Sequence, residues 1–385
     1  MSKRIEIADV FRRFLSEYQA RFGKVMLPSQ RKAVSNIISC MTEAMGGKRF
    51  QCNDCSKTFY CYHGCRNRSC PKCHGRQTVD WLKTREAEML PCEYFHVVAT
   101  VPSDLRPLFL KEQKFMYGLL MRTVAGALCE IAEDPHYIGA KPGILSVLHT
   151  WTAKMHHHPH VHMLVTGGGV SEDGEHWHEA KGGYLVPVKK LSKLISRRFA
   201  EGLGKERPEL FTQVPAKTWK KEWCSFSKHF GRGRDAVLQY LARYVFRIAV
   251  TSSRIEAVTE SHVTFRYKDN STGEWKRETI TGVDFMRRFL LHVLPKGFHK
   301  VRYYGLWSPG KRKIQAMAGI MLKMTQMNEP EVKVLKLADL VEEALAISQI
   351  EAHGFVPKCP NCKSENVTEK EKIRRKRWRK MFSAG

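Results

Sequence analysis

The sequence contains no long hydrophobic run. No stretch approaches the roughly 20 uncharged apolar residues that a membrane-spanning helix needs, and the start, MSKRIEIADVFRRFL, has no apolar core of signal-peptide length. We therefore expect a cytoplasmic protein with no membrane partner. The 385 residues, of which 43% are hydrophobic, are enough for two or three small domains with a substantial core.

Acidic residues are scarce relative to basic ones. The 38 Asp and Glu residues face 65 Lys and Arg residues, so the formal net charge is +27. This excess is larger than solubility requires and predicts a polyanionic partner, with nucleic acid ahead of a membrane surface. A merely soluble basic protein is the alternative. The sequence also lacks a GxxxxGK[ST] phosphate loop, so no motif indicates nucleotide hydrolysis.

Half of the twelve cysteines fall in one short segment, CNDCSKTFYCYHGCRNRSCPKCHGR, which begins at Cys52. In a reducing compartment such clustering favours metal binding over disulfides. Cys52 and Cys55 form one CxxC pair and Cys70 and Cys73 another, a spacing that lets four thiolates close one structural zinc site. A redox role is the alternative. Further potential ligands, for a second zinc ion or as substitutes at the first, are Cys61, His63, Cys65 and His74.

Basic residues alternate with these ligands. Their side chains would give the folded segment a cationic surface for DNA phosphates; they are Lys57, Arg66, Arg68, Lys72 and Arg76. Near the end of the chain, Cys359 and Cys362 form one more CxxC pair, which needs partners from elsewhere in the chain or from another subunit. The tail EKEKIRRKRWRK that follows is expected to be a mobile phosphate-binding arm.

The segment MHHHPHVHMLVTGGG, residues 155–169, is typical of a strand. Apolar and histidine side chains alternate, so His160 and His162 point to one face while Val161 points to the core. We expect the glycines from Gly167 to end the strand. Two neutral imidazoles on one face form half of a divalent-metal site. The alternative is a histidine-rich surface loop that binds metal adventitiously.

The segment DAVLQYLARYVFRIAV, residues 235–250, has helical spacing. Tyr240 and Tyr244 lie one turn apart, beside an apolar stripe that would face the core. Arg243 and Arg247 lie just beyond the tyrosines. Phenols next to phosphate-binding guanidiniums suit a DNA-cleaving tyrosine, although tyrosines at this spacing are also common as core aromatics.

The remaining segments predict an α+β fold with a mainly antiparallel sheet flanked by helices. Helical spacing precedes the cysteines at 5–22 and 28–45, and a strand with His96 follows them, then a helix at 110–134 and a strand at 143–154. A hairpin around NSTG, a helix at 284–294 and a strand at 300–307 suggest either a basic DNA-facing unit or a packing unit.

We expect five segments along the chain. They are an N-terminal helical segment (1–45), a zinc-binding module (46–90), a core with the histidines and tyrosines (91–252), a β-rich accessory unit (253–310), and a helical and basic tail (311–385).

Four motifs together resemble the rolling-circle insertion-sequence transposases of the IS91 family. They are HPHVH, YLARY, CRNRSCPKC and HVLPKGFHKVRYYG, and the resemblance extends from the helical start to about Leu306. It implies an HUH-endonuclease core, named for a histidine-hydrophobic-histidine strand, with Tyr240 and Tyr244 as nucleophiles. Ser69 stands where the family often has histidine, which leaves the zinc-ligand set open.

The resemblance also implies the chemistry. His160 and His162 would hold a catalytic Mg²⁺ or Mn²⁺, and a further likeness to the first strand of parvoviral Rep nucleases, which carry a metal-binding glutamate at that position, implies His96 as the third ligand. A tyrosine would form a 5′-phosphotyrosine link and release a 3′-hydroxyl. The expected partners are single-stranded DNA at the ends of the element and target DNA, in a bacterial, nucleoid-associated setting.

Three other functions remain open at this stage. A plasmid or phage replication initiator would use the same nuclease core. A transposase of the acidic-triad type would use carboxylates such as Asp104, Glu201 and Asp235, and a zinc-finger regulator would bind DNA without cutting it.

Overall fold

The structure is a computed structural model that describes most of the chain. The described ranges are 5–73, 89–183, 185–221, 223–240, 244–245, 247–269, 271–326 and 357–376. The chain divides into two compact units. Unit 1 holds Met1–Asp80, Ile248–Val293 and Val341–Gly385, and unit 2 holds Trp81–Arg247 and Leu294–Leu340. These units regroup the five predicted segments, because 248–293 joins the cysteine-rich part and 294–340 joins the part with the histidine strand.

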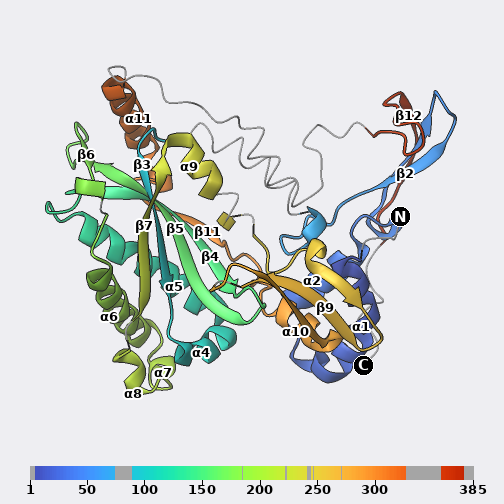
Figure 1. Ribbon diagram of the computed structural model, residues 1–385, viewed down its shortest axis with the longest axis horizontal. Coiled ribbons are helices and arrows are strands. Elements are labelled where there is room, and N and C mark those ends of the chain that lie inside the picture. The colour runs from blue at the N-terminus through green and yellow to red at the C-terminus, as the bar shows by residue number, and fades with distance from the viewer. Residues whose placement is uncertain are drawn as a thin grey trace. The chain divides into compact units, whose positions relative to one another are not determined.

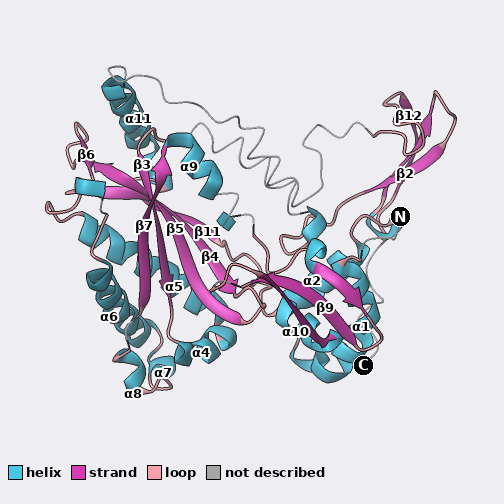
Figure 2. Cartoon of the chain, in the orientation of Figure 1, coloured by secondary structure: helices cyan, strands magenta, loops and turns pink. Residues whose placement is uncertain are grey.

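Unit 2 is built on one antiparallel sheet (Figure 2), as the sequence predicts. The strand order is β11 (Val301–Gly305), β4 (Lys141–Trp151), β5 (His157–Val170), β3 (Glu93–Thr100) and β7 (Cys224–Arg232), and the short β6 (Trp177–Glu179) pairs with β5. All of these pairings are antiparallel.

The glycines of β5 do not end the strand, contrary to the prediction, because β5 continues through them to Val170. A Cβ atom on Gly168 would lie 2.4 Å from the backbone oxygen of His178 and 2.6 Å from the Trp177 ring. Glycine here allows β6 to approach closely and pair with β5.

Helices cover both faces of this sheet (Figure 1). One face packs on α4 (Arg106–Lys111), α5 (Gln113–Ala132), α6 (Val188–Glu206), α7 (Pro208–Phe211) and α8 (Ala216–Trp219), and its core includes Val97, Val161 and Met163. The other face packs on α9 (Gly233–Tyr240) and α11 (Arg312–Gln326), through Tyr94 and Leu164. The alternation of β3 and β5 residues between the two cores is the period-two pattern of the sequence.

Helix α5 is long and apolar enough, by length and composition alone, to cross a membrane. Its side chains are mostly buried, and Leu120, Val124 and Leu128 lie in the core beneath the sheet. It therefore has the environment of a core helix.

The predicted tyrosine helix is only partly described. Helix α9 covers Gly233–Tyr240, and Tyr244 and Val245 form a π-helical turn. Residues 241–243, which include the predicted DNA contact Arg243, and residue 246 lie outside the described part.

Unit 1 packs two N-terminal helices, α1 (Ile7–Phe22) and α2 (Pro28–Ser39), against α10 (Gly282–Leu290). The Phe11 and Phe289 rings meet edge to face at 5.2 Å, and Gln30 Nε2 donates to the carbonyl oxygen of Leu290 at 3.0 Å. A sheet of β8 (Ile255–Val258), β9 (His262–Lys268) and β10 (Trp275–Thr281) precedes α10, and β9 and β10 form the predicted hairpin. This packing explains why 248–293 belongs to unit 1.

A second sheet of unit 1 joins distant parts of the sequence. Its order is β12 (Val367–Ile373), β1 (Gly47–Cys52) and β2 (Thr58–Tyr62). The predicted mobile arm therefore begins as an ordered strand, β12, which is a correction. Lys48 of β1 and Glu369 of β12 form an ion pair at 2.6 Å. Residues 377–385 of the tail lie outside the described part.

Candidate active site and zinc clusters

Three neighbouring strands of unit 2 carry histidines on the face that packs on α9. His149 of β4 pairs directly with His160 of β5, and His162 follows two residues later on the same face. One ring nitrogen of each of these three residues lies within 4.8 Å of the others, as in a metal site. His96 of β3 also contacts this group, because its Nε2 lies 2.9 Å from His162 Nδ1.

Each of the three histidines has one ring nitrogen engaged by the protein. His149 Nε2 donates to the carbonyl oxygen of Tyr244 at 2.6 Å, and His160 Nδ1 donates to the carbonyl oxygen of His158 at 2.7 Å. His162 Nδ1 is hydrogen-bonded to His96 Nε2. Such contacts fix the ring and its tautomer, so the opposite nitrogen is the one that can bind an ion.

Burial keeps these imidazoles neutral at physiological pH. It lowers the pKa of His160 to about 4 and holds the pKa values of His149 and His162 well below the usual range. Neutral imidazole is the form that ligates metal.

The predicted third ligand and the observed group differ. The sequence assigned this role to His96, whereas the structure groups His149 with His160 and His162. His96 pairs with Leu164 across β3 and β5, two residues away from His162, while His149 lies directly opposite His160. The sequence did contain a signal for His149, since it lies in the strand predicted at 143–154, next to the histidine strand.

Tyr244 lies against the histidines. Its ring centroid is 4.3 Å from that of His162 and 4.5 Å from that of His96, with tilted planes. The side chain is half-buried. The structure therefore places one of the two predicted nucleophiles beside the candidate metal site.

Tyr240 lies one step further into the core. Its ring is 5.0 Å from the Tyr244 ring and 5.7 Å from the His96 ring, and the side chain is fully buried. Burial raises the pKa of its phenol well above the usual value of 10. The two tyrosines thus share a site but differ in access to solvent.

The two carboxylates of the acidic-triad alternative whose side chains are described each have a basic partner. Asp104 contacts Lys221, which holds the pKa of its carboxyl below the usual value, and Glu201 lies 3.7 Å from Arg197. The side chain of Asp235 lies outside the described part. Among the described residues, the candidate metal groups that contain carboxylates reduce to an exposed turn with Asp173, Glu175 and His176.

The described DNA-binding candidates have different environments. Arg247 is exposed. Arg68 is partly buried, which lowers the pKa of its guanidinium, whereas Arg66 is exposed. Lys72 forms an ion pair with Glu6 at 2.6 Å, so part of the expected cationic surface is neutralised. Arg76 lies outside the described residues.

The cysteines form two four-thiol groups, and neither has the ligand set predicted for the first zinc site. Cys52 and Cys55 do not meet Cys70 and Cys73, which is a correction. One group is Cys40, Cys65, Cys70 and Cys73, and the other is Cys52, Cys55, Cys359 and Cys362. Cys61 belongs to neither, and burial raises the pKa of its thiol. In the second group, the partners of the C-terminal CxxC pair are Cys52 and Cys55.

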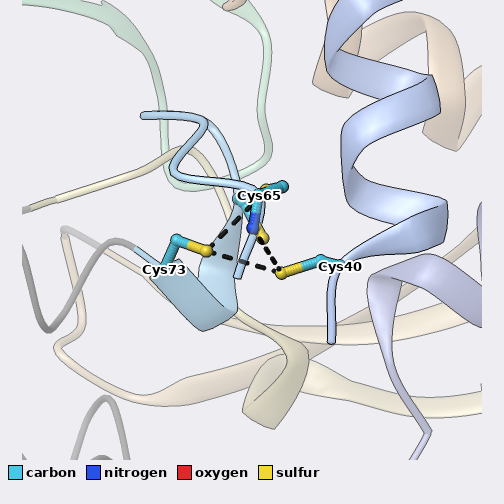
Figure 3. Close-up of side chains that lie close together, drawn as sticks. Cys40, Cys65 and Cys73 are labelled. Atoms are coloured by element: carbon cyan, nitrogen blue, oxygen red, sulfur yellow. Dashed lines mark hydrogen bonds between the residues drawn. The ribbon is translucent and has the colours of Figure 1, made fainter. Parts of the chain in front are cut away.

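The first group forms where helix α2 ends. Cys40 follows the last residue of α2, and Figure 3 shows its sulfur pointing toward those of Cys65 and Cys73. The Sγ atoms of Cys40 and Cys73 are 3.4 Å apart, and those of Cys65 and Cys73 are 3.7 Å apart. Four sulfurs about 2.3 Å from a tetrahedral zinc ion would be about 3.8 Å apart, so the spacing fits zinc. The set is complete without a histidine at Ser69.

The second group closes across the three-stranded sheet. The Sγ atoms of Cys52 and Cys362 lie 3.5 Å apart, and those of Cys55 and Cys359 are also 3.5 Å apart. Hydrogen bonding, first of all from the backbone N–H of Lys57, lowers the pKa of Cys55 to about 6. A thiol that ionises near neutral pH is ready to bind zinc.

Comparisons with known proteins give a family match for two parts of the chain. A family model described as "Transposase zinc-binding domain" matches residues 10–101, and one described as "Putative transposase" matches residues 143–315. The chain is 38% identical to "Putative transposase y4qJ" of Sinorhizobium fredii over 317 residues, which is 78% of this chain and 79% of the relative.

A second relative is the "Transposase for insertion sequence element IS801" of Pseudomonas savastanoi pv. phaseolicola. The identity is 27% over 292 residues, which is 71% of this chain and 69% of the relative. No solved structure matches the chain. The zinc-binding domain, the match to the second family model and the extent of both alignments show that the chain belongs to the IS91 family of insertion-sequence transposases.

Proposed function

We propose that this transposase nicks and joins single-stranded DNA at the ends of its element through a tyrosine nucleophile, in rolling-circle transposition, and that the sheet of unit 2 is an HUH-nuclease core. One observation carries the proposal. The Tyr244 ring lies 4.3 Å from His162, which belongs to a buried group of three neutral histidines. A tyrosine that served only to pack the core would not require a group of histidines beside it.

The three histidines fit a divalent ion. Their ring nitrogens are close together and their free bases are favoured by burial. Imidazole ligands suit transition-metal ions, whereas Mg²⁺ prefers oxygen ligands, so the transition metal Mn²⁺ is the better match of the two expected ions. When bound by His149, His160 and His162, such an ion would polarise a non-bridging phosphate oxygen and orient the scissile bond.

Tyr244 would make the first attack. Its phenol oxygen forms a bond to phosphorus while the bond from phosphorus to O3′ breaks, and the proton lost by the phenol is balanced by the proton gained at O3′. The products are a 5′-phosphotyrosine and a free 3′-hydroxyl. A phenol with pKa about 10 is only about 0.1% ionised at pH 7, which corresponds to about 4 kcal/mol that the site must offset.

Tyr240 would serve a second strand. Because a phosphotyrosine ester keeps the energy of the broken bond, a 3′-hydroxyl can attack it and rejoin DNA without nucleotide hydrolysis. Two tyrosines allow one end to be held while another is cut. Full burial of Tyr240 means that the segment around it must shift before it can reach DNA.

The test is a covalent adduct. The protein is incubated with Mn²⁺ and labelled single-stranded DNA that carries the ends of the element, and the adduct is detected in a denaturing gel as a protease-sensitive band. We expect an adduct from the wild type and none from His160→Ala/His162→Ala, whose zinc content should be unchanged because the cysteine groups lie elsewhere. An adduct of equal yield from this variant would reject the metal-assisted mechanism.

A further inference from the structure

The edge strand β7 carries an exposed aromatic residue beside the candidate active site. Phe226 has 47% of its surface exposed, although it is a large apolar side chain. β7 is an edge strand of the described sheet, and its neighbour in the strand order is β3. Phe226 lies opposite Val98, and Val98 lies opposite His162.

This register puts the exposed ring close to the chemistry. Neighbouring strands are about 4.8 Å apart, so Phe226 and His162 are separated by about 10 Å across the sheet. Residues in directly opposed positions project from the same face. The Phe226 ring indeed meets the His96 ring edge to face at 6.2 Å, and His96 contacts both His162 and Tyr244.

Phe226 differs from the neighbouring aromatic residue of the strand. Phe230 is half-buried, and its ring centroid lies 5.8 Å from that of His96 and 5.9 Å from that of Tyr240. Packing against these rings explains why an aromatic residue stands at position 230. Lys228, which pairs with His96 between these two phenylalanines, is exposed. The edge of the active face therefore presents an open aromatic ring next to a cation.

We propose that Phe226 is a stacking platform for a base of single-stranded DNA next to the scissile phosphate, with Lys228 on the adjoining backbone. The inference rests on the proposed function. Stacking on an aromatic ring suits single strands because every base has a flat face, and a nearby cation binds the phosphate. The net charge of +27 favours this occupant over a second copy of the same basic chain.

The experiment measures binding and contact with one probe. A short oligothymidine that carries 5-iodouracil is titrated with the full chain by fluorescence anisotropy and is then cross-linked by ultraviolet light. In the wild type we expect the cross-link in the tryptic peptide 222–228, which contains Phe226. Phe226→Leu should lose it and bind about tenfold more weakly, whereas Phe226→Trp should keep both signals. Trp275→Leu removes an exposed aromatic ring of unit 1 and is the control.

Two results would overturn the platform. One is wild-type affinity and cross-linking in Phe226→Leu. The other is a wild-type dimer in sedimentation that Phe226→Leu converts to a monomer, since the edge would then be covered by a second copy. If the cross-link forms as expected but the element's ends give no covalent adduct, the platform stands and the proposed function fails.

Discussion

The C-terminal CxxC pair provides the sharpest prediction about the zinc-binding part. The double substitution Cys359→Ser/Cys362→Ser removes half of one four-thiol group and leaves the other intact. We expect the zinc content to fall from two ions per chain to one. The matched control is Cys61→Ser, because Cys61 lies in the same sheet but in neither group.

The structure indicates what else is lost. The core beneath this sheet is small and rests on the stacked rings of Phe50 and Phe59, 5.7 Å apart. Two buried phenylalanines contribute about 5 kcal/mol together, whereas a structural zinc ion contributes about 10 kcal/mol or more. Without the ion, β12 should therefore separate from β1.

Two measurements follow this change. Native mass spectrometry counts the zinc ions, and limited trypsin digestion reports whether β12 is paired, since cleavage after Lys370 and Lys372 requires an open strand. We expect rapid cleavage in the double variant and slow cleavage in Cys61→Ser. Two zinc ions in Cys359→Ser/Cys362→Ser, or the loss of one in Cys61→Ser, would refute the grouping.

Three further predictions concern unit 2. His149→Ala should lower the rate of DNA nicking more than about 100-fold, because even outer partners of metal ligands have effects of 10–100-fold; equal loss in the exposed neighbour control His156→Ala would count against a specific ligand. In a nicking assay Tyr244→Phe should give no first cut while Tyr240→Phe still cuts but does not join strands, and the reverse pattern would reject our order. Tyr117→Phe, which removes a hydroxyl 2.8 Å from a buried histidine, should lower the free energy of unfolding by about 1–3 kcal/mol in urea titration without changing the nicking rate per folded protein; unchanged stability would contradict this.

The histidine strand was predictable because its signal is local. Alternation around Val161 places His160 and His162 on one face whatever the neighbouring strands do, and β5 has this arrangement. The third histidine was not predictable in the same way. Whether His96 or His149 completes the group depends on the register of β5 against β3 and β4, which is set by packing over the whole sheet.

The cysteine pattern failed for a related reason. Sequence spacing favours partners that are close along the chain, and it joined Cys52 with Cys70. The structure instead joins Cys52 with Cys362, which is 310 residues away. Cys40 was missed because it stands alone, outside any CxxC pair, at the end of a helix. In both cases the missing information is tertiary, since it depends on which chain segments pair.

The most direct test of the nuclease proposal is to locate the DNA-linked residue. Trypsin should release Tyr240 in the peptide DAVLQYLAR and Tyr244 in the peptide YVFR, so the two tyrosines are separated by one digestion. The covalent adduct formed with single-stranded element ends is digested with nuclease and trypsin and analysed by mass spectrometry. We predict that the remaining nucleotide is attached to YVFR in the wild type and that Tyr240→Phe/Tyr244→Phe gives no adduct. A nucleotide on DAVLQYLAR would reject the proposed order of the two tyrosines. A nucleotide on a peptide other than these two, or an adduct from the double variant, would contradict the proposal that these tyrosines cut the DNA.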